Sequence, residues 1–68
     1  MTRIRVRLLP DGEERIIEAE GPLTAGRLLK MLGLSRESHV VMVNGRPVPE
    51  PELLGEGEVV VVRVLSGG

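Results

Sequence analysis

Residues 58–65 of the chain read Glu-Val-Val-Val-Val-Arg-Val-Leu, and this stretch is the strongest indication of the fold. Valine favours extended backbone, because branching at Cβ restricts its rotamers in a helix and packs well on a pleated surface. Four consecutive valines leave neither face of the strand polar, which is typical of a strand in the middle of a sheet. The sequence therefore predicts a central strand over 58–65.

The first strand is predicted over residues 3–9, where arginines alternate with aliphatic residues. This period of two gives a strand with one face in water and the other in the core. Asp11 and Gly12 form a strong signal for a two-residue type I′ turn, which predicts a hairpin with a second strand over 14–20. The corresponding register pairs Arg5 with Glu18, Arg3 with Glu20, Val6 with Ile17 and Ile4 with Ala19.

A helix of about eight residues is predicted next. Thr24 is a good N-cap, and Gly33 suits the left-handed position that ends a helix. The apolar stripe of this helix consists of Ala25, Leu28, Leu29 and Leu32. A helix this short is unstable alone, so we expect it to pack on the sheet.

The second half of the chain predicts another hairpin. Residues 39–43 are strand-like, Asn44-Gly45 is a second type I′ signal, and 46–48 return as a short strand. Pro47 cannot donate a ladder hydrogen bond, so this strand belongs at an edge of the sheet. Residues 51–54 are expected to form a single turn whose leucines enter the core.

These elements together predict an α+β fold: a mixed sheet of four to five strands with one helix packed on one face. We expect the first and last strands to be parallel neighbours at the centre of the sheet, because the last strand is too apolar for an edge. A chain of 68 residues has room for one small domain.

Composition excludes several classes of function. Nine basic residues face ten acidic ones, and aromatic residues are absent, so the chain lacks the basic surface and the stacking side chains of nucleic-acid-binding proteins. No apolar run approaches the ~20 residues that span a bilayer. We therefore expect a cytoplasmic protein that binds neither nucleic acid nor membrane.

The chain also lacks the residues that a metal site or a nucleophilic catalyst would need. The chain has no cysteine, and one histidine, His39, cannot build a metal site alone. No serine or cysteine nucleophile pairs with His39, for which a loop or strand-edge role is expected. The glutamates fall on water-facing positions, where solubility is a better explanation than acid–base catalysis. We expect a protein that is not an enzyme and that holds no metal or cofactor.

The last strand carries more apolar side chains than one helix can cover. Because strand side chains alternate, Val59 and Val61 share one face and the following valines share the other. If the first pair faces the helix, the other set forms an exposed apolar surface, which is typical of a partner-binding site. This predicted partner surface consists of Val40, Met42, Val60, Val62 and Val64.

The end of the sequence is the second unusual feature. Ser66, Gly67 and Gly68 follow the central strand, and glycine has no Cβ to obstruct a narrow channel. We expect 66–68 to form a flexible tail that presents the Gly68 carboxylate to the buried active site of another protein.

Three stretches carry a resemblance to a known family: 41–45 (Val-Met-Val-Asn-Gly), 55–58 (Gly-Glu-Gly-Glu) and 64–68 (Val-Leu-Ser-Gly-Gly). In the predicted order of elements they resemble the ThiS/MoaD family of ubiquitin-like sulfur carriers, a group that includes archaeal small modifiers. The resemblance implies a ubiquitin-like β-grasp domain over 1–65 with a C-terminal tail over 66–68. Ser66 before the glycine pair is more similar to MoaD than to ThiS.

The resemblance also implies a mechanism. An ATP-using, ubiquitin-activating-type adenylyltransferase would adenylate Gly68, with ATP bound by that partner. Attack by a persulfide would then lead to a thiocarboxylate that donates sulfur to an acceptor enzyme, for molybdopterin, thiamine or tRNA thiolation. Attack by an amine would tag a target protein, and Lys30, the only lysine, is the side chain available for self-conjugation. The sequence leaves both routes open.

A second interpretation belongs to another class of function. β-Grasp domains also act as interaction or adaptor modules that are never conjugated. Such a module would use the same valine-rich sheet face without any chemistry at the tail.

Overall fold

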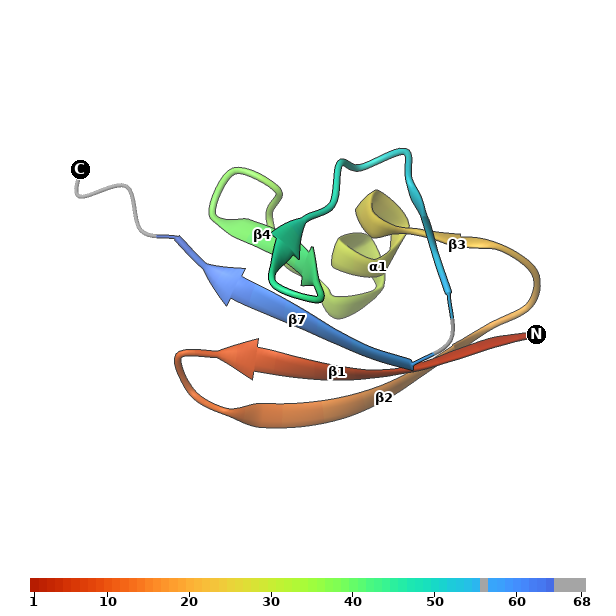
Figure 1. Cartoon of the computed structure of the whole chain (residues 1–68), viewed down its shortest axis with the longest axis horizontal. Helices are drawn as coiled ribbons and strands as arrows, with labels where there is room; N and C mark the ends of the chain where they lie inside the picture. Colours follow the sequence, from red (N-terminus) through yellow and green to blue (C-terminus); the bar gives the residue numbers. More distant parts are fainter. Residues whose placement is uncertain (56, 65–68) are drawn as a thin grey trace.

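The structure of the chain, a computed structural model, describes residues 1–55 and 57–64. A five-stranded mixed sheet has the strand order β2-β1-β7-β4-β5, one helix packs on one of its faces, and two further strands form a small second sheet (Figure 1). The elements in chain order are β1 (Thr2–Leu9), β2 (Glu13–Ala19), β3 (Leu23–Thr24), α1 (Ala25–Leu32), β4 (His39–Val43), β5 (Arg46–Pro47), β6 (Leu53–Leu54) and β7 (Gly57–Arg63). The predicted α+β fold is confirmed.

Strand β7 lies at the centre of the sheet, as the valine run predicts. It pairs in parallel with β1 and antiparallel with β4. Strand β5 is at the edge, where Pro47 does not interrupt a ladder on both sides. The Asn44-Gly45 turn is confirmed as well, since both residues have the positive φ, 54° and 78°, that a type I′ turn requires.

The register predicted for the β1–β2 hairpin is wrong by two residues. Leu8 pairs with Glu13, so the loop contains four residues, 9–12, and only Gly12 in it has a positive φ. A two-residue loop at Asp11-Gly12 would need the N–H of Pro10 to close the ladder opposite Glu13, and proline has none. A shift of two keeps every side chain on its predicted face. The observed cross-strand ion pairs join Arg3 to Glu18 and Arg7 to Glu14.

Helix α1 begins and ends where its capping residues predict. The Thr24 hydroxyl accepts a hydrogen bond from the Arg27 N–H at 3.2 Å. Gly33 has a φ of 73°, and the N–H groups of Gly33 and Leu34 donate to the carbonyls of Lys30 and Leu29, the pattern of a Schellman motif. The stripe residues Ala25, Leu28 and Leu29 are buried and Leu32 is partly buried.

The second sheet corrects the turn expected over 51–54. Strand β6 pairs antiparallel with β3, with Leu23 opposite Leu54. Only one of the two leucines enters the core, because adjacent strand residues point to opposite sides: Leu54 is 6% exposed and Leu53 is 60% exposed.

The core lies between α1 and the inner face of the sheet. Its buried side chains are entirely aliphatic within residues 1–55 and 57–64, and no polar or charged residue there is buried. The buried set comprises Ile4, Val6, Ala19, Leu23, Ala25, Leu28, Leu29, Val41, Leu54, Val59 and Val61. No helix in these ranges is long and apolar enough to cross a membrane.

Candidate functional site

The two faces of β7 have the assignment that the sequence predicts. Val59 and Val61 are 2% and 1% exposed and belong to the core beneath α1. Val60 and Val62 point to the opposite face, where both are partly buried. The helix covers one face of the sheet, so the other face keeps its apolar side chains at the surface.

Strand β4 supplies the rest of this surface. Val40 lies opposite Val62 and Met42 lies opposite Val60 in the antiparallel ladder. Opposed side chains in such a ladder contact each other, which is why these four are partly buried and not fully exposed. Val64, directly after β7, is 44% exposed. We call this surface, made of Val40, Met42, Val60, Val62 and Val64, the valine patch.

The valine patch has one apolar neighbour that was not predicted from the sequence. Leu9 is the β1 partner of Val62 and is 36% exposed. The period-two pattern could have found it, because Leu9 shares a face with Arg5 and Arg7, the outward-facing residues of β1. The missing information was the register of β1 against β7, which places Leu9 opposite Val62.

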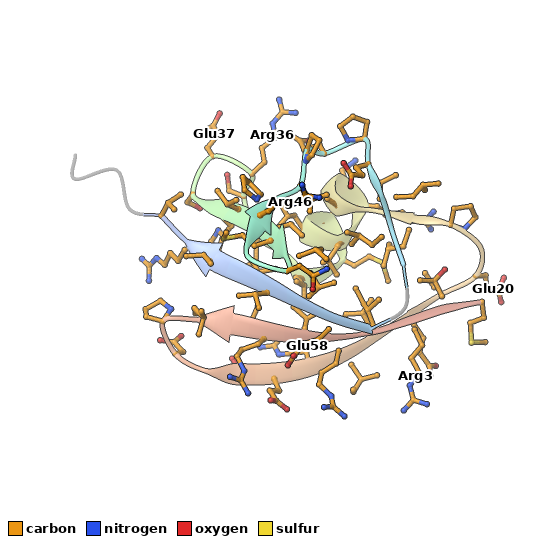
Figure 2. The ribbon with its side chains drawn as sticks, viewed as in Figure 1. Arg3, Glu20, Arg36, Glu37, Arg46 and Glu58 are labelled. Atoms are coloured by element: carbon orange, nitrogen blue, oxygen red, sulfur yellow. The ribbon has the colours of Figure 1, made fainter. Side chains whose placement is uncertain are left out.

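Charged side chains line the β1 and β2 side of the patch. Arg7 is the β1 partner of Val60, and its guanidinium donates to the Glu14 carboxylate at 3.0 Å. This hydrogen bond, with the negative charges of Glu14 and Glu58, raises the pKa of Arg7 above its already high ordinary value. Arg7 therefore stays cationic, and the patch has an apolar centre with a charged rim. Figure 2 shows Glu58 on β7 beside β1, and Arg3 farther away, toward the start of β1.

The chain leaves β7 at a fixed point. The Val64 N–H donates to the Ser38 carbonyl at 2.8 Å, which ties the end of the strand to the loop before β4. The Ser38 hydroxyl lies 2.8 Å from His39 Nδ1, and the Ser35 carbonyl lies 3.2 Å from the same nitrogen. His39 begins β4, directly after the loop that holds Ser35 and Ser38. The expectation that no serine pairs with His39 is wrong, because the hydroxyl of the adjacent Ser38 contacts its ring.

The other predicted site residues lie elsewhere. Lys30 is exposed on α1, which packs on the inner face of the sheet, so it projects on the side of the molecule away from the valine patch. Ser66, Gly67 and Gly68 fall outside the described residues. Within residues 1–55 and 57–64, no three histidine, aspartate or glutamate side chains gather in a way that would hold a metal ion.

Comparisons with known sequences identify the family of the chain and a relative of it. The profile of the family described as small archaeal modifier protein 2 matches residues 2–65. An uncharacterized protein of Archaeoglobus fulgidus is 40% identical over 58 residues, which is 85% of this chain and 85% of that protein. The family profile, over residues 2–65, spans all the strands and the helix described above.

Solved structures show the same fold at low identity. The ubiquitin of Caldiarchaeum subterraneum superposes with a TM-score of 0.72 at 18% identity, covering 98% of both chains. The ubiquitin-like domain of Plasmodium falciparum Dsk2 superposes with a TM-score of 0.74 at 15% identity, covering 91% of this chain and 96% of that one. The fold is therefore the ubiquitin-like β-grasp that the sequence predicts.

Proposed function

Because the chain belongs to the small archaeal modifier protein 2 family, we propose that it is a carrier whose Gly68 carboxylate is activated by a partner enzyme and then transferred. The observation that carries this proposal is the position of the valine patch. The patch extends along β7 to Val64, and Gly68 is four residues farther along the sequence. Four extended residues span at most about 14 Å, so an enzyme seated on the patch would have Gly68 within reach.

Activation is needed because a carboxylate is a poor electrophile, with its negative charge spread over two oxygens. In the proposed step a Gly68 carboxylate oxygen attacks the α-phosphorus of ATP held by a ubiquitin-activating-type adenylyltransferase. The bond from that phosphorus to the bridging oxygen breaks, pyrophosphate leaves, and Gly68 becomes a mixed anhydride with AMP. The chain supplies the carboxylate and the docking surface, and the partner supplies ATP and the catalytic groups.

Two nucleophiles could then displace AMP. A protein persulfide would form an acyl disulfide, and a second thiol would cleave its S–S bond, leaving a Gly68 thiocarboxylate for sulfur donation to molybdopterin, thiamine or tRNA thiolation. A lysine amine would instead form an isopeptide with loss of AMP and a proton, which tags the target protein. The same activated Gly68 serves both routes.

The valine patch alone would also suit a permanent adaptor, the second candidate. An adaptor would dock through the patch and would keep its function without Gly68. The carrier and the adaptor would therefore both use the valine patch, and only the carrier would need Gly68.

Intact-mass spectrometry of the chain purified from its native host tests the proposal. Replacement of one oxygen by sulfur adds about 16 Da, and an isopeptide appears as a branched peptide carrying the C-terminal residues. Either species supports the carrier, and neither should form with a Gly68-deletion variant expressed in the same host. An unmodified chain whose deletion variant keeps every function of the wild type would support the adaptor.

A further inference from the structure

A cleft of about 580 Å³ lies on the side of the molecule opposite the valine patch. One wall is α1, and the others are the loop that follows the helix and the segment before β6. Its floor is aliphatic and its rim is charged. The side chains that matter for its chemistry are Leu29, Leu34, Arg27, Lys30, Arg36 and Glu50.

The rim is strongly basic compared with the rest of the chain. Three cations and one carboxylate line it, whereas the whole chain has a net charge of −1. The carboxylate of Glu50 lies 3.3 Å from Arg36. In the part of the chain that the structure describes, neither Arg27 nor Lys30 forms an ion pair. Two cations on adjacent turns of α1 therefore face the cleft with their charge available.

The floor suits an aliphatic group. Leu34 is partly buried and presents carbon atoms at the base of the cleft, whereas Leu29, which also lines the cleft, is only 4% exposed. The volume lies within the range of roughly 300–1,000 Å³ that is usual for ligand sites. An aliphatic floor under a cationic rim fits a ligand that combines apolar side chains with carboxylates.

The backbone argues against a small inorganic anion. The N–H groups at the start of α1 would be the natural cradle for phosphate, and all three are occupied. The N–H of Ala25 donates to the Glu52 carbonyl at 3.1 Å, that of Gly26 to the Glu50 carbonyl at 3.0 Å, and that of Arg27 to the Thr24 hydroxyl. Attraction for anions in the cleft therefore comes from side chains alone, which favours carboxylates spaced along a peptide.

The segment that supplies these carbonyls, residues 50–52, packs closely against the start of α1. A Cβ on Gly26 would lie only 3.2 Å from the Glu50 Cβ, so a larger residue at position 26 would push the helix and this segment slightly apart. The wall carries the Glu50 carboxylate that orients Arg36 across the cleft.

We propose that the cleft is a second docking surface, which binds an extended acidic peptide of a partner protein. The carboxylates of the peptide would pair with Arg27 and Lys30, and an aliphatic side chain would contact Leu34 and the small exposed part of Leu29. The cleft and the valine patch are on opposite sides of the sheet, so both surfaces can be occupied at once. The inference is independent of the tail chemistry proposed above.

The test is a titration of the isotopically labelled full chain with a peptide of sequence Leu-Glu-Glu-Leu-Glu-Glu-Leu, followed by NMR. We expect amide shifts at residues 26–30, 34–36 and 50, and none at Val60 or Val62, which do not line the cleft. The same peptide with glutamine in place of glutamate should bind much more weakly. Inorganic phosphate at equal ionic strength should not displace the acidic peptide.

Two double variants with the same change in net charge test the role of the charged rim of the cleft. Arg27→Glu/Lys30→Glu should weaken binding about tenfold, because two attractive charges become repulsive. Arg3→Glu/Arg46→Glu makes the same change in net charge at two sites that do not line the cleft (Figure 2), and at physiological salt, where screening acts over about 8 Å, it should change affinity by less than about twofold. Circular dichroism verifies that both variants fold.

Three results would overturn the proposal. Equal weakening by the two double variants would show attraction by net charge without a site. Shifts confined to the valine patch would place the peptide on the other face. Complete displacement by phosphate would show a simple anion site. Because shift mapping uses the wild-type chain, a variant that fails to fold leaves the test intact.

Discussion

The turn conformation of Gly12 was predicted correctly from the sequence, but the length of the loop that contains it was not. The Asp11-Gly12 pair correctly indicates a turn, and Gly12 has a φ of 82° in the left-handed region. The loop is nevertheless a four-residue loop, closed by the Gly12 N–H donating to the Leu8 carbonyl. Proline at position 10 changes the loop length without changing which residue needs to be glycine.

Replacing Gly12 by valine should lower the free energy of unfolding by roughly 1–3 kcal/mol, because a β-branched residue would be held at positive φ. A Cβ at this position meets nothing within 4 Å, so backbone strain alone would cause the loss. Gly55→Val is the matched control, since Gly55 also has open space for a Cβ and its φ lies outside the positive range. Thermal melting of both variants measures the difference, and equal midpoints would contradict this account of the loop.

Strand β7 contributes side chains to the core from one face and to the valine patch from the other. Adjacent valines on one strand have different surroundings: Val61 is 1% exposed beneath α1, and Val62 is partly buried opposite Val40. The alternation follows from strand geometry, so the sequence alone could assign both faces.

Aspartate should mainly disturb folding at position 61 and mainly disturb partner binding at position 62. Val61→Asp should unfold the domain, because a carboxylate in an aliphatic core has no partner. Val62→Asp should keep the fold with a smaller loss of stability, and it should lower affinity for the activating enzyme about thirtyfold or more, since an interface anchor contributes about 2 kcal/mol. Circular dichroism and a pull-down with that enzyme separate the two effects. An unfolded Val62→Asp beside a folded Val61→Asp would reverse the face assignment.

Elements with a periodic or capping signal were predictable from the sequence. Thr24 and Gly33 delimit α1, and Asn44-Gly45 forms the predicted turn, because these signals depend on local backbone geometry. The β3–β6 pair was missed, since two residues per strand are too few to show a period of two and the partners are far apart in sequence.

The two candidate surfaces also differ in how far the sequence could predict them. The valine patch could be predicted, because its members alternate along two strands that the sequence identifies. The basic cleft could not, since Arg27, Arg36 and Glu50 come from three segments that meet only in the folded chain. No spacing in the sequence indicates that contact.

At the scale of the whole molecule, the chain has two distinct sides. One side carries the valine patch, which extends to Val64, and the other carries α1 with Lys30 and the basic cleft. Conjugation to a lysine and docking through the patch would therefore use different sides. An isopeptide at Lys30 would also convert a cation of the cleft into a neutral amide.

The single lysine gives a clear prediction for self-conjugation. If the chain forms polymers through isopeptides, a Lys30→Arg variant should still be activated at Gly68 and should lose every lysine-linked polymer, because no other lysine exists in the sequence. Peptide mapping of material from the native host provides the measurement. A branched peptide at the N-terminal amine, with none at Lys30, would refute this assignment.

ATP–pyrophosphate exchange with the cognate adenylyltransferase measures whether Gly68 is the activated group. We expect exchange with the full chain and loss of exchange when Gly68 is deleted or Gly67 is replaced by a bulky residue, with circular dichroism spectra unchanged. Val62→Asp should reduce exchange at low concentration of the chain and recover it at high concentration, because it weakens docking and leaves Gly68 intact. Undiminished exchange with the Gly68-deletion variant would contradict the claim.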